Sequence, residues 1–346
     1  PHVVTDPVDG EVWVYEGIKG KTGSAMNATV HRTKREISLD GLTYDEMAPG
    51  CYDPVARIDD MNTAGILASL NFPSAPRFCG QLFWEGKDKD LGLVCVKAWN
   101  DWMTDEWCAA APGRYIPLML IPLWDPILAA KEVERMAAKG VKALAFSENP
   151  TPLGLPDIHD PSGYWDPVWS TCNDTGVVVC MHIGSSSVMP KISENAPFVA
   201  NMTWGASRTA GTMLAWLFSG LFTRFPNLKI SLAEGNIGWI PYFLERAEYV
   251  WERQRYWNEQ GQTFEGQSAD GKAHGSLASD FAYEDFDIRQ LYLDHVYGCF
   301  LDDKAGLKMI EEVGEDNIMV ETDYPHSDTT WPDSQKLMND RVAEAG

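Results

Sequence analysis

The sequence predicts an α/β fold in which a parallel sheet is covered by helices. Short apolar, β-branched runs alternate with longer amphipathic segments over most of the 346 residues. The apolar runs are continuous, as is typical of strands buried on both faces. Polar residues gather directly after these runs, where a barrel of parallel strands places its active site. We therefore expect a (β/α)8 barrel rather than the alternative, an open parallel sheet.

Seven segments have the pattern of buried strands and five that of helices between them. The strands are expected at residues 66–72, 115–123, 141–147, 176–184, 228–235, 295–301 and 317–323. The helices are expected at 56–65, 125–140, 209–226, 239–254 and 302–314. Segment 125–140 begins with Asp-Pro and ends with glycine, the usual boundaries of a helix. An eight-stranded barrel needs one strand more, so we expect this chain to lack the first strand.

The chain is expected to form one domain over residues 1–346. Residues 1–50 are rich in glycine and charge and predict an irregular N-terminal segment, in which 11–17 alternates like an exposed hairpin strand. Residues 258–290 are polar and rich in glycine and serine, and predict an excursion loop.

Charge and hydropathy exclude several classes of partner. The chain has 50 acidic and 28 basic residues and a formal net charge of -22. Such a polyanion repels phosphate backbones and anionic lipid surfaces, so we expect neither nucleic acid nor a membrane as partner. No apolar run approaches the roughly 20 residues of a membrane-spanning helix, and the first residues do not have the pattern of a signal peptide. We expect a cytoplasmic protein.

The cysteine and glycine patterns argue against several kinds of site. Seven cysteines are scattered without a CxxC pair, which favours buried thiols in a reducing compartment over disulfides or a zinc knuckle. Cys180 is a weaker alternative, a nucleophile on the same strand face as His182. The chain has no GxGxxG at a strand–helix turn, which excludes a dinucleotide-dependent dehydrogenase.

The candidate metal ligands lie at two strand ends. His182 ends segment 176–184 and Asp323 ends segment 317–323, so in a barrel both point into the same mouth. An imidazole and a carboxylate suit one divalent transition metal, zinc foremost, with manganese or iron as alternatives. His326 is a candidate proton carrier. Glu234 ends segment 228–235 and is a candidate general base, ligand or orienting partner of His182.

Other polar residues at strand ends suit a small anionic or aromatic substrate. Arg77 follows the first predicted strand and can bind a carboxylate. Ser147, Glu148 and Asn149 follow the third strand, and we assign Asn149 to substrate binding together with Trp331. For each candidate an ordinary structural role is the alternative: a core histidine, a turn aspartate, a helix cap or a surface arginine.

Four motifs in order then resemble one known family. YDPVARIDDMNTAG, HIGSSS, EGNIGW and TDYPHSDTTWP, between Tyr52 and Ser334, are similar to the metal-dependent amidohydrolase superfamily, in its aminocarboxymuconate-semialdehyde decarboxylase-like branch. The resemblance implies a distorted (β/α)8 barrel with a metal at its mouth, held by His182 on the fifth strand and Asp323 on the eighth. The family's first-strand ligand pair has no match in residues 1–50, and many of its decarboxylases have a catalytic histidine at the position of Glu234.

These features lead to a metal-dependent hydrolase as the first hypothesis. A metal-activated water would attack an ester, thioester, amide or lactone of a small organic acid. Asp323 would accept the proton of that water, and Glu234 or His326 would protonate the leaving group. The alternative is non-oxidative decarboxylation of an aromatic or enol acid. An alternative of another class is a catalytically silent ligand-binding barrel. We also expect a homodimer, with the apolar residues between Trp239 and Trp257 as candidate contacts.

Overall fold

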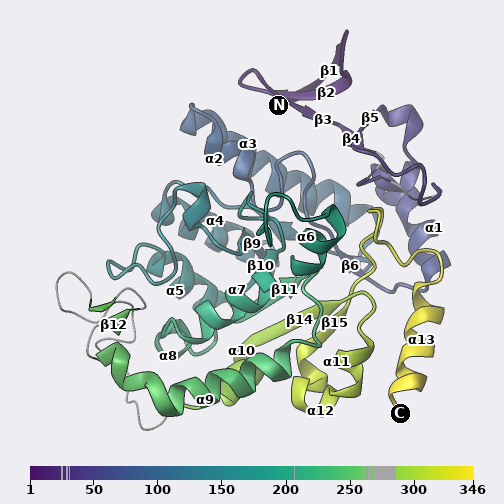
Figure 1. Ribbon diagram of the computed structural model, residues 1–346. Coiled ribbons are helices and arrows are strands. Elements are labelled where there is room, and N and C mark those ends of the chain that lie inside the picture. The colour runs from purple at the N-terminus through teal and green to yellow at the C-terminus, as the bar shows by residue number, and fades with distance from the viewer. Residues whose placement is uncertain are drawn as a thin grey trace. The chain divides into compact units, whose positions relative to one another are not determined.

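The computed structural model describes residues 1–24, 26–28, 30, 32–205, 207–259, 262–263, 266–267 and 286–346 (Figure 1). The chain divides into two compact units, which are described one at a time. The first contains residues 1–146 and 320–346, and the second contains residues 147–319. The expectation of a single domain stays a prediction.

The second unit is built on parallel strands. They are β10 (Val178–His182), β11 (Ile230–Ala233) and β14 (Val296–Phe300), and the part of β15 (Ile318–Val320) that belongs to this unit lies beside β14. All four residues of β11 are buried, as its continuous apolar sequence predicts. The register of β10 and β11 sets His182 opposite Ala233. The residue after Ala233 is Glu234, so this register brings two of the predicted site residues to neighbouring strand ends.

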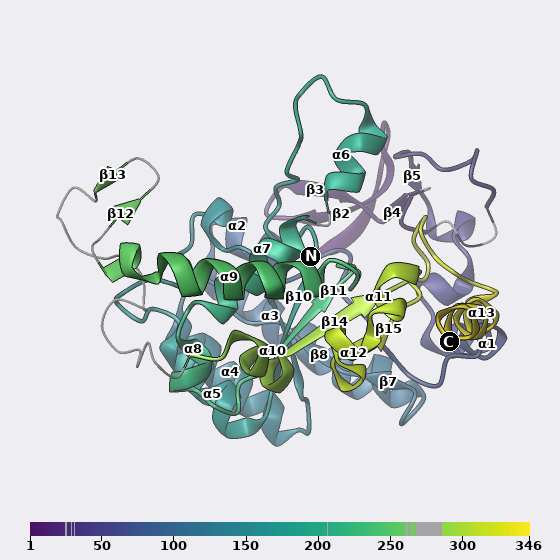
Figure 2. The same ribbon diagram turned by 60° about the horizontal axis from the view of Figure 1, so that its bottom comes forward.

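Helices cover these strands, and tryptophans fill the space beneath them. Helices α7, α9 and α10 pack against one another (Figures 1 and 2). Three tryptophans are fully buried: Trp165, Trp169 and Trp216. The rings of Trp169 and Trp216 pack edge to face, with their centroids 5.1 Å apart. The helices of this unit are α5 (Asp166–Thr175), α6 (Phe198–Trp204), α7 (Ser207–Leu217), α8 (Leu221–Arg224), α9 (Ile240–Glu259), α10 (Ile288–His295), α11 (Lys304–Lys308) and α12 (Ile310–Val313).

The first unit begins with an antiparallel sheet. It consists of β1 (His2–Asp6), β2 (Gly10–Tyr15) and β3 (Ile18–Lys21), followed by the short pair β4 (Gly23–Ser24) and β5 (Gly41–Leu42). The prediction of an irregular segment over residues 1–50 is therefore wrong for its first half. Strand β2 confirms the hairpin strand at 11–17, but Val12 and Tyr15 are buried, because one face of this sheet packs on the core.

The remainder of the first unit carries short strands and long helices. Strand β6 (Ser69–Leu70) pairs with β7 (Tyr115–Ile116), and β8 (Leu118–Met119) pairs with the part of β9 (Ala143–Ser147) that belongs to this unit, in both cases parallel. Pro117 lacks a backbone donor and separates β7 from β8, which divides the predicted strand 115–123. The helices are α1 (Pro54–Ala64), α2 (Gln81–Glu85), α3 (Lys89–Trp102), α4 (Pro126–Ala138) and α13 (Ser334–Ala345).

The predicted pattern of strands and helices is largely confirmed. Each of the seven predicted strand segments contains a strand, and each predicted helix segment contains a helix. Segment 209–226 is two helices rather than one: α7 ends at Leu217, and Gly220, with a φ of +75°, is the N-cap of α8. The excursion loop predicted at 258–290 lies mostly outside the described residues, between the end of α9 at Glu259 and the start of α10 at Ile288.

Two further predictions concern the thiols and the membrane. The seven cysteines all lie among the described residues and form no disulfide; six are buried and Cys51 is half-buried, which confirms the interpretation as buried thiols. Burial raises the pKa of the Cys172 thiol far above its ordinary value. Across the described residues, none of the helices has the length and apolar character needed to cross a membrane.

Candidate active site

A histidine and a glutamate meet at the ends of β10 and β11. The Nε2 atom of His182 lies 3.2 Å from Oε1 of Glu234. The side chains of His182 and Glu234 are 11% and 22% exposed, so both are largely sheltered but still reach solvent. The two side chains are therefore neighbours, while the choice among the roles expected of Glu234 (ligand, general base or orienting partner of His182) stays a prediction.

The hydrogen bond of the other ring nitrogen of His182 determines the protonation of the atom that faces Glu234. Nδ1 lies 2.6 Å from the carbonyl oxygen of Ile183. A carbonyl oxygen only accepts hydrogen bonds, so Nδ1 carries a proton and Nε2 of the neutral ring has a lone pair. The Glu234 carboxylate is an acceptor as well. Two acceptors 3.2 Å apart repel unless they share a cation, so the pair is built around one positive charge, either a proton or a metal ion.

A buried carboxylate to which the sequence analysis assigned no role lies beside this pair. Glu148, directly after β9, accepts a hydrogen bond from the backbone N–H of Gly184 at 2.9 Å. It also forms a buried ion pair with Arg208 of α7. The available signal was the position of Glu148 directly after a strand, but Arg208 is distant in sequence and nothing in the sequence links the two.

In the first unit, Asp323 and His326 form a second pair. Oδ2 of Asp323 lies 2.9 Å from Nδ1 of His326, and the backbone N–H of His326 donates to the Asp323 carbonyl at 2.7 Å. This turn makes a carboxylate–imidazole pair from residues three apart. The two side chains are therefore neighbours, while their roles in proton transfer stay predictions.

The turn after Asp323 is anchored by a buried arginine. Arg57 of α1 donates from its guanidinium to the carbonyl oxygen of Tyr324 at 2.8 Å and lies 4.5 Å from the centre of the Tyr324 ring. The Tyr324 hydroxyl bonds to the Asp60 carboxylate, and burial together with this bond raises the pKa of Tyr324 far above its ordinary value. Burial also lowers the pKa of Arg57. The backbone beside Asp323 is thereby held in place.

Three of the predicted site residues have an unusual backbone conformation. The φ angles of Arg77, Glu234 and Asp323 are 60°, 57° and 49°, in the left-handed region that a side chain with a Cβ rarely adopts. Such strain is concentrated at functional sites, where the surrounding structure holds a side chain in one direction. The conformation therefore agrees with a functional role of these three residues.

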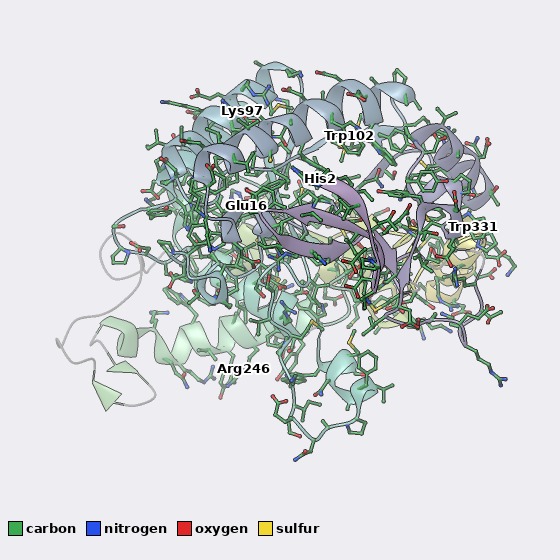
Figure 3. The ribbon with its side chains drawn as sticks, turned by 90° about the horizontal axis from the view of Figure 1, so that it is seen from above. His2, Glu16, Lys97, Trp102, Arg246 and Trp331 are labelled. Carbon is green, nitrogen blue, oxygen red and sulfur yellow. The ribbon has the colours of Figure 1, made fainter. Side chains whose placement is uncertain are left out.

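The predicted substrate-binding residues are held by local contacts. Arg77 forms an ion pair with Glu85, and the side-chain oxygen of Asn149 accepts from the backbone N–H of Thr151 at 3.1 Å. Trp331 lies in the segment that leads into α13 (Figure 3), and its indole N–H donates to the Asp60 carbonyl at 3.1 Å. Trp331 also lines a small hollow with Arg57 and Tyr324. Substrate binding by all three stays a prediction.

The donor chemistry of both pairs fits a divalent transition metal. Each pair offers one imidazole nitrogen and one carboxylate oxygen, which zinc and manganese both accept. The proton on Nδ1 of His182 leaves Nε2 as the nitrogen that can bind an ion. Among the described residues, however, His, Cys, Asp and Glu side chains do not come together in threes at any potential metal site. His182 and Asp323 belong to different units, and their binding of one ion stays a prediction.

Comparison with known families finds matches over nearly the whole chain. The profile of the family described as Amidohydrolase matches residues 8–345. A gamma-resorcylate decarboxylase of Rhodococcus jostii is 28% identical over 223 residues, which are 61% of this chain and 64% of the relative. A 2-amino-3-carboxymuconate-6-semialdehyde decarboxylase of Dictyostelium discoideum is 24% identical over 62% of this chain and 56% of its own length. The match thus spans less than two thirds of each of these relatives.

Solved structures confirm the predicted fold class, a distorted (β/α)8 barrel. An amidohydrolase of Mycobacterium avium subsp. paratuberculosis has a TM-score of 0.62, at 20% identity, over 90% of this chain and 72% of the other. The 5-carboxyvanillate decarboxylase of Novosphingobium aromaticivorans, in complex with manganese and 4-hydroxy-3-methoxy-5-nitrobenzoic acid, has a TM-score of 0.58, at 18% identity, over 83% and 72% of the two chains. Whether the first barrel strand is absent stays a prediction.

Proposed function

Because the chain belongs to the amidohydrolase family, we propose that it is a metal-dependent, non-oxidative decarboxylase of a small aromatic carboxylic acid. The observation that carries this proposal is the His182–Glu234 pair, in which an imidazole nitrogen and a carboxylate oxygen 3.2 Å apart require a shared positive charge. The relatives named above are decarboxylases, which favours this reaction over the hydrolysis that the sequence alone suggested.

The proposed metal-binding residues are His182, the last residue of β10, and Asp323, which follows β15; they offer an imidazole nitrogen and a carboxylate oxygen. Zinc and manganese both suit these donors, and manganese is bound in the related 5-carboxyvanillate decarboxylase. A bound divalent ion would polarise the carboxylate of the substrate and a neighbouring oxygen. Arg77, Asn149 and Trp331 are the proposed contacts to the rest of the substrate.

The protein's own part in the reaction is to place a proton. In decarboxylation the bond between the ring carbon and the carboxyl carbon breaks, carbon dioxide leaves, and the electron pair remains on the ring carbon. That carbon then takes up one proton. Glu234 is the proposed donor, because it lies against His182 at a sheltered strand end and is held there in a strained conformation. His326, paired with Asp323, is the proposed route for replacing the proton from solvent.

The test is product analysis in deuterated water. Protein loaded with manganese or zinc is incubated with 2,6-dihydroxybenzoate and related hydroxybenzoates, and separately with aryl esters and lactones. Release of carbon dioxide with one deuterium at the vacated ring carbon supports the proposal. Glu234→Gln should lower the rate about a hundredfold or more, the range for loss of a general acid.

Two other outcomes would replace the proposal. Hydrolysis of the esters or lactones without release of carbon dioxide would establish the hydrolase, which is the second candidate because Glu234 stands where family decarboxylases have a catalytic histidine. Binding of aromatic acids without turnover or metal would establish a silent binding barrel.

The assembly and surroundings of the protein belong to the same proposal. We expect a homodimer in the cytoplasm. The exposed Tyr242 and Tyr249 of α9 support an association through that helix. Light scattering on purified protein checks this, and a monomer at micromolar concentration would contradict it.

A further inference from the structure

The peptide group between Ile183 and Gly184 is hydrogen-bonded both at its carbonyl and at its N–H. The carbonyl of Ile183 accepts from Nδ1–H of His182 at 2.6 Å. The N–H of the same peptide group, which belongs to Gly184, donates to Oε1 of Glu148 at 2.9 Å. The three groups therefore form a continuous chain from a carboxylate through a peptide to an imidazole.

Glu148 is firmly held at one end of this chain. Its side chain is 5% exposed, and that of its ion-pair partner Arg208 is 8% exposed. Oε1 also accepts from the hydroxyl of Ser186 at 2.9 Å and from its backbone N–H at 3.4 Å. The buried Oε2 has no hydrogen-bond partner among the residues that the structure describes. The contacts of the carboxylate are thus concentrated on the oxygen that faces the loop after His182.

The loop itself is tied to the end of β9 by further bonds. The backbone N–H of Glu148 donates to the Ser185 hydroxyl at 2.8 Å, and the Ser147 hydroxyl donates to the Ser185 carbonyl at 3.2 Å. Gly184 has a φ of +94°, which a residue with a Cβ adopts only under strain. The chain therefore turns at Gly184 in a way that presents this peptide to both His182 and Glu148.

This arrangement has an effect beyond anchoring the loop. A carboxylate on a peptide N–H polarises that peptide, so its carbonyl becomes a stronger acceptor for Nδ1–H. A stronger bond at Nδ1 favours the tautomer whose lone pair is on Nε2 and fixes the orientation of the ring. Carboxylates that contact a metal-binding histidine directly do the same. Here the peptide group transmits the effect.

We propose that Glu148 is a positioning residue that acts through the Ile183–Gly184 peptide to hold His182 with Nε2 ready to bind a metal ion. Arg208 keeps the Glu148 carboxylate in place. The inference rests on the proposed function in that the ion is the one assigned to His182. Nothing in it depends on the identity of the substrate.

The experiment compares Glu148→Gln with a matched control, Glu132→Gln. Glu132 is also a buried glutamate paired with an arginine, Arg135, but it lies in the first unit and bonds to Asn100 instead of to the loop after His182. In metal-free protein, nitrogen-15 spectra of the histidine rings report the tautomer of His182, identified by the signal that disappears in His182→Gln. Zinc affinity is measured by competition with a chromophoric chelator at fixed pH.

The expected result is that Glu148→Gln lowers the population of the Nδ1–H tautomer and weakens zinc binding about tenfold, the lower end of the range for partners of metal-binding histidines. Glu132→Gln should change neither. An unchanged tautomer in folded Glu148→Gln would overturn the inference. If that variant does not fold, the neutral pair Glu148→Gln with Arg208→Gln is judged by the same criterion.

The two proposals fail separately. Wild-type protein that binds neither zinc nor manganese would overturn the proposed metal site, and the tautomer in metal-free protein would still decide the role of Glu148.

Discussion

Because the backbone at Glu234 is in the left-handed region, we expect glycine to be more stable than alanine at this position. Glu234 has a φ of 57° directly after a buried strand. A residue with a Cβ in this conformation costs about 1–2 kcal/mol relative to glycine. Replacing glycine by alanine restricts the unfolded chain, which favours alanine by about 0.4–1 kcal/mol. The central values of the two ranges leave Glu234→Gly more stable than Glu234→Ala by about 0.8 kcal/mol, and both variants lose the same contact with His182.

A helical glutamate provides the control. Glu134 is exposed in the middle of α4, where the backbone is an ordinary helix. There glycine is less favourable than alanine by about 1 kcal/mol. The order of the two variants should therefore be opposite at the two positions.

The assay is urea unfolding of the four variants, followed by far-ultraviolet circular dichroism. At each position, the free energies of unfolding of the glycine and alanine variants are compared with the same dependence on urea concentration for both. If alanine is the more stable residue at both positions, the backbone at Glu234 is not strained and the reasoning from its φ angle is refuted. Both Glu234 variants should also lose activity, since neither has the carboxylate.

Four further predictions test other parts of the structure. Asp323→Asn should lower turnover by about a hundredfold or more with an unchanged unfolding midpoint; full activity would remove Asp323 from the chemistry. Tyr324→Phe takes the hydroxyl donor from the Asp60 carboxylate and should cost about 1–2 kcal/mol of unfolding free energy in urea, whereas an unchanged midpoint would contradict that bond. Burial raises the pKa of Tyr15 to about 12. The folded state therefore holds this proton more tightly than the unfolded state. The free energy of unfolding should not depend on this group below about pH 10 and should fall between about pH 10 and 12, less steeply in Tyr15→Phe. Equal pH slopes of the wild type and Tyr15→Phe would contradict this. Burial also raises the pKa of the Cys108 thiol to about 11, so at pH 8 this thiol should react slowly with a disulfide reagent in native protein and fast in urea; fast native labelling would contradict its burial.

The strands that carry the site could be predicted because their sequences are unambiguous. Segments such as GVVVCMH and LKISLAE are continuously apolar and end in one polar residue, so the sequence predicts both the buried strand and the residue at its end. The contact between His182 and Glu234 follows from the parallel register of two such strands. Helix α3 was missed, although Asp88 is a readable N-cap whose carboxylate accepts from the backbone N–H of Leu91.

Other parts of the site depend on contacts that no sequence pattern encodes. Glu148 and Asn149 are adjacent and both follow β9, yet Glu148 is buried against the loop after His182 and Asn149 is exposed. Which of the two faces inward is decided by the direction of the chain after the strand. The partner of Glu148, Arg208, belongs to a helix whose position is set only by the packing of the whole second unit.

Each unit of the molecule contains its own row of closely spaced aromatic rings. In the first unit, the centroids of successive rings are 5.0 and 5.6 Å apart along the row Trp99, Trp102 and Trp107. In the second, they are 6.2 and 5.1 Å apart along the row Trp165, Trp169 and Trp216. Indole rings at such separations exchange excitation energy and couple their transition dipoles. Each row therefore gives its unit an optical signature that exists only while the rings stay packed. Trp102→Phe in one variant and Trp169→Phe in another would each remove the signal of one unit. Following the remaining signal during unfolding would then show which unit loses its packing first.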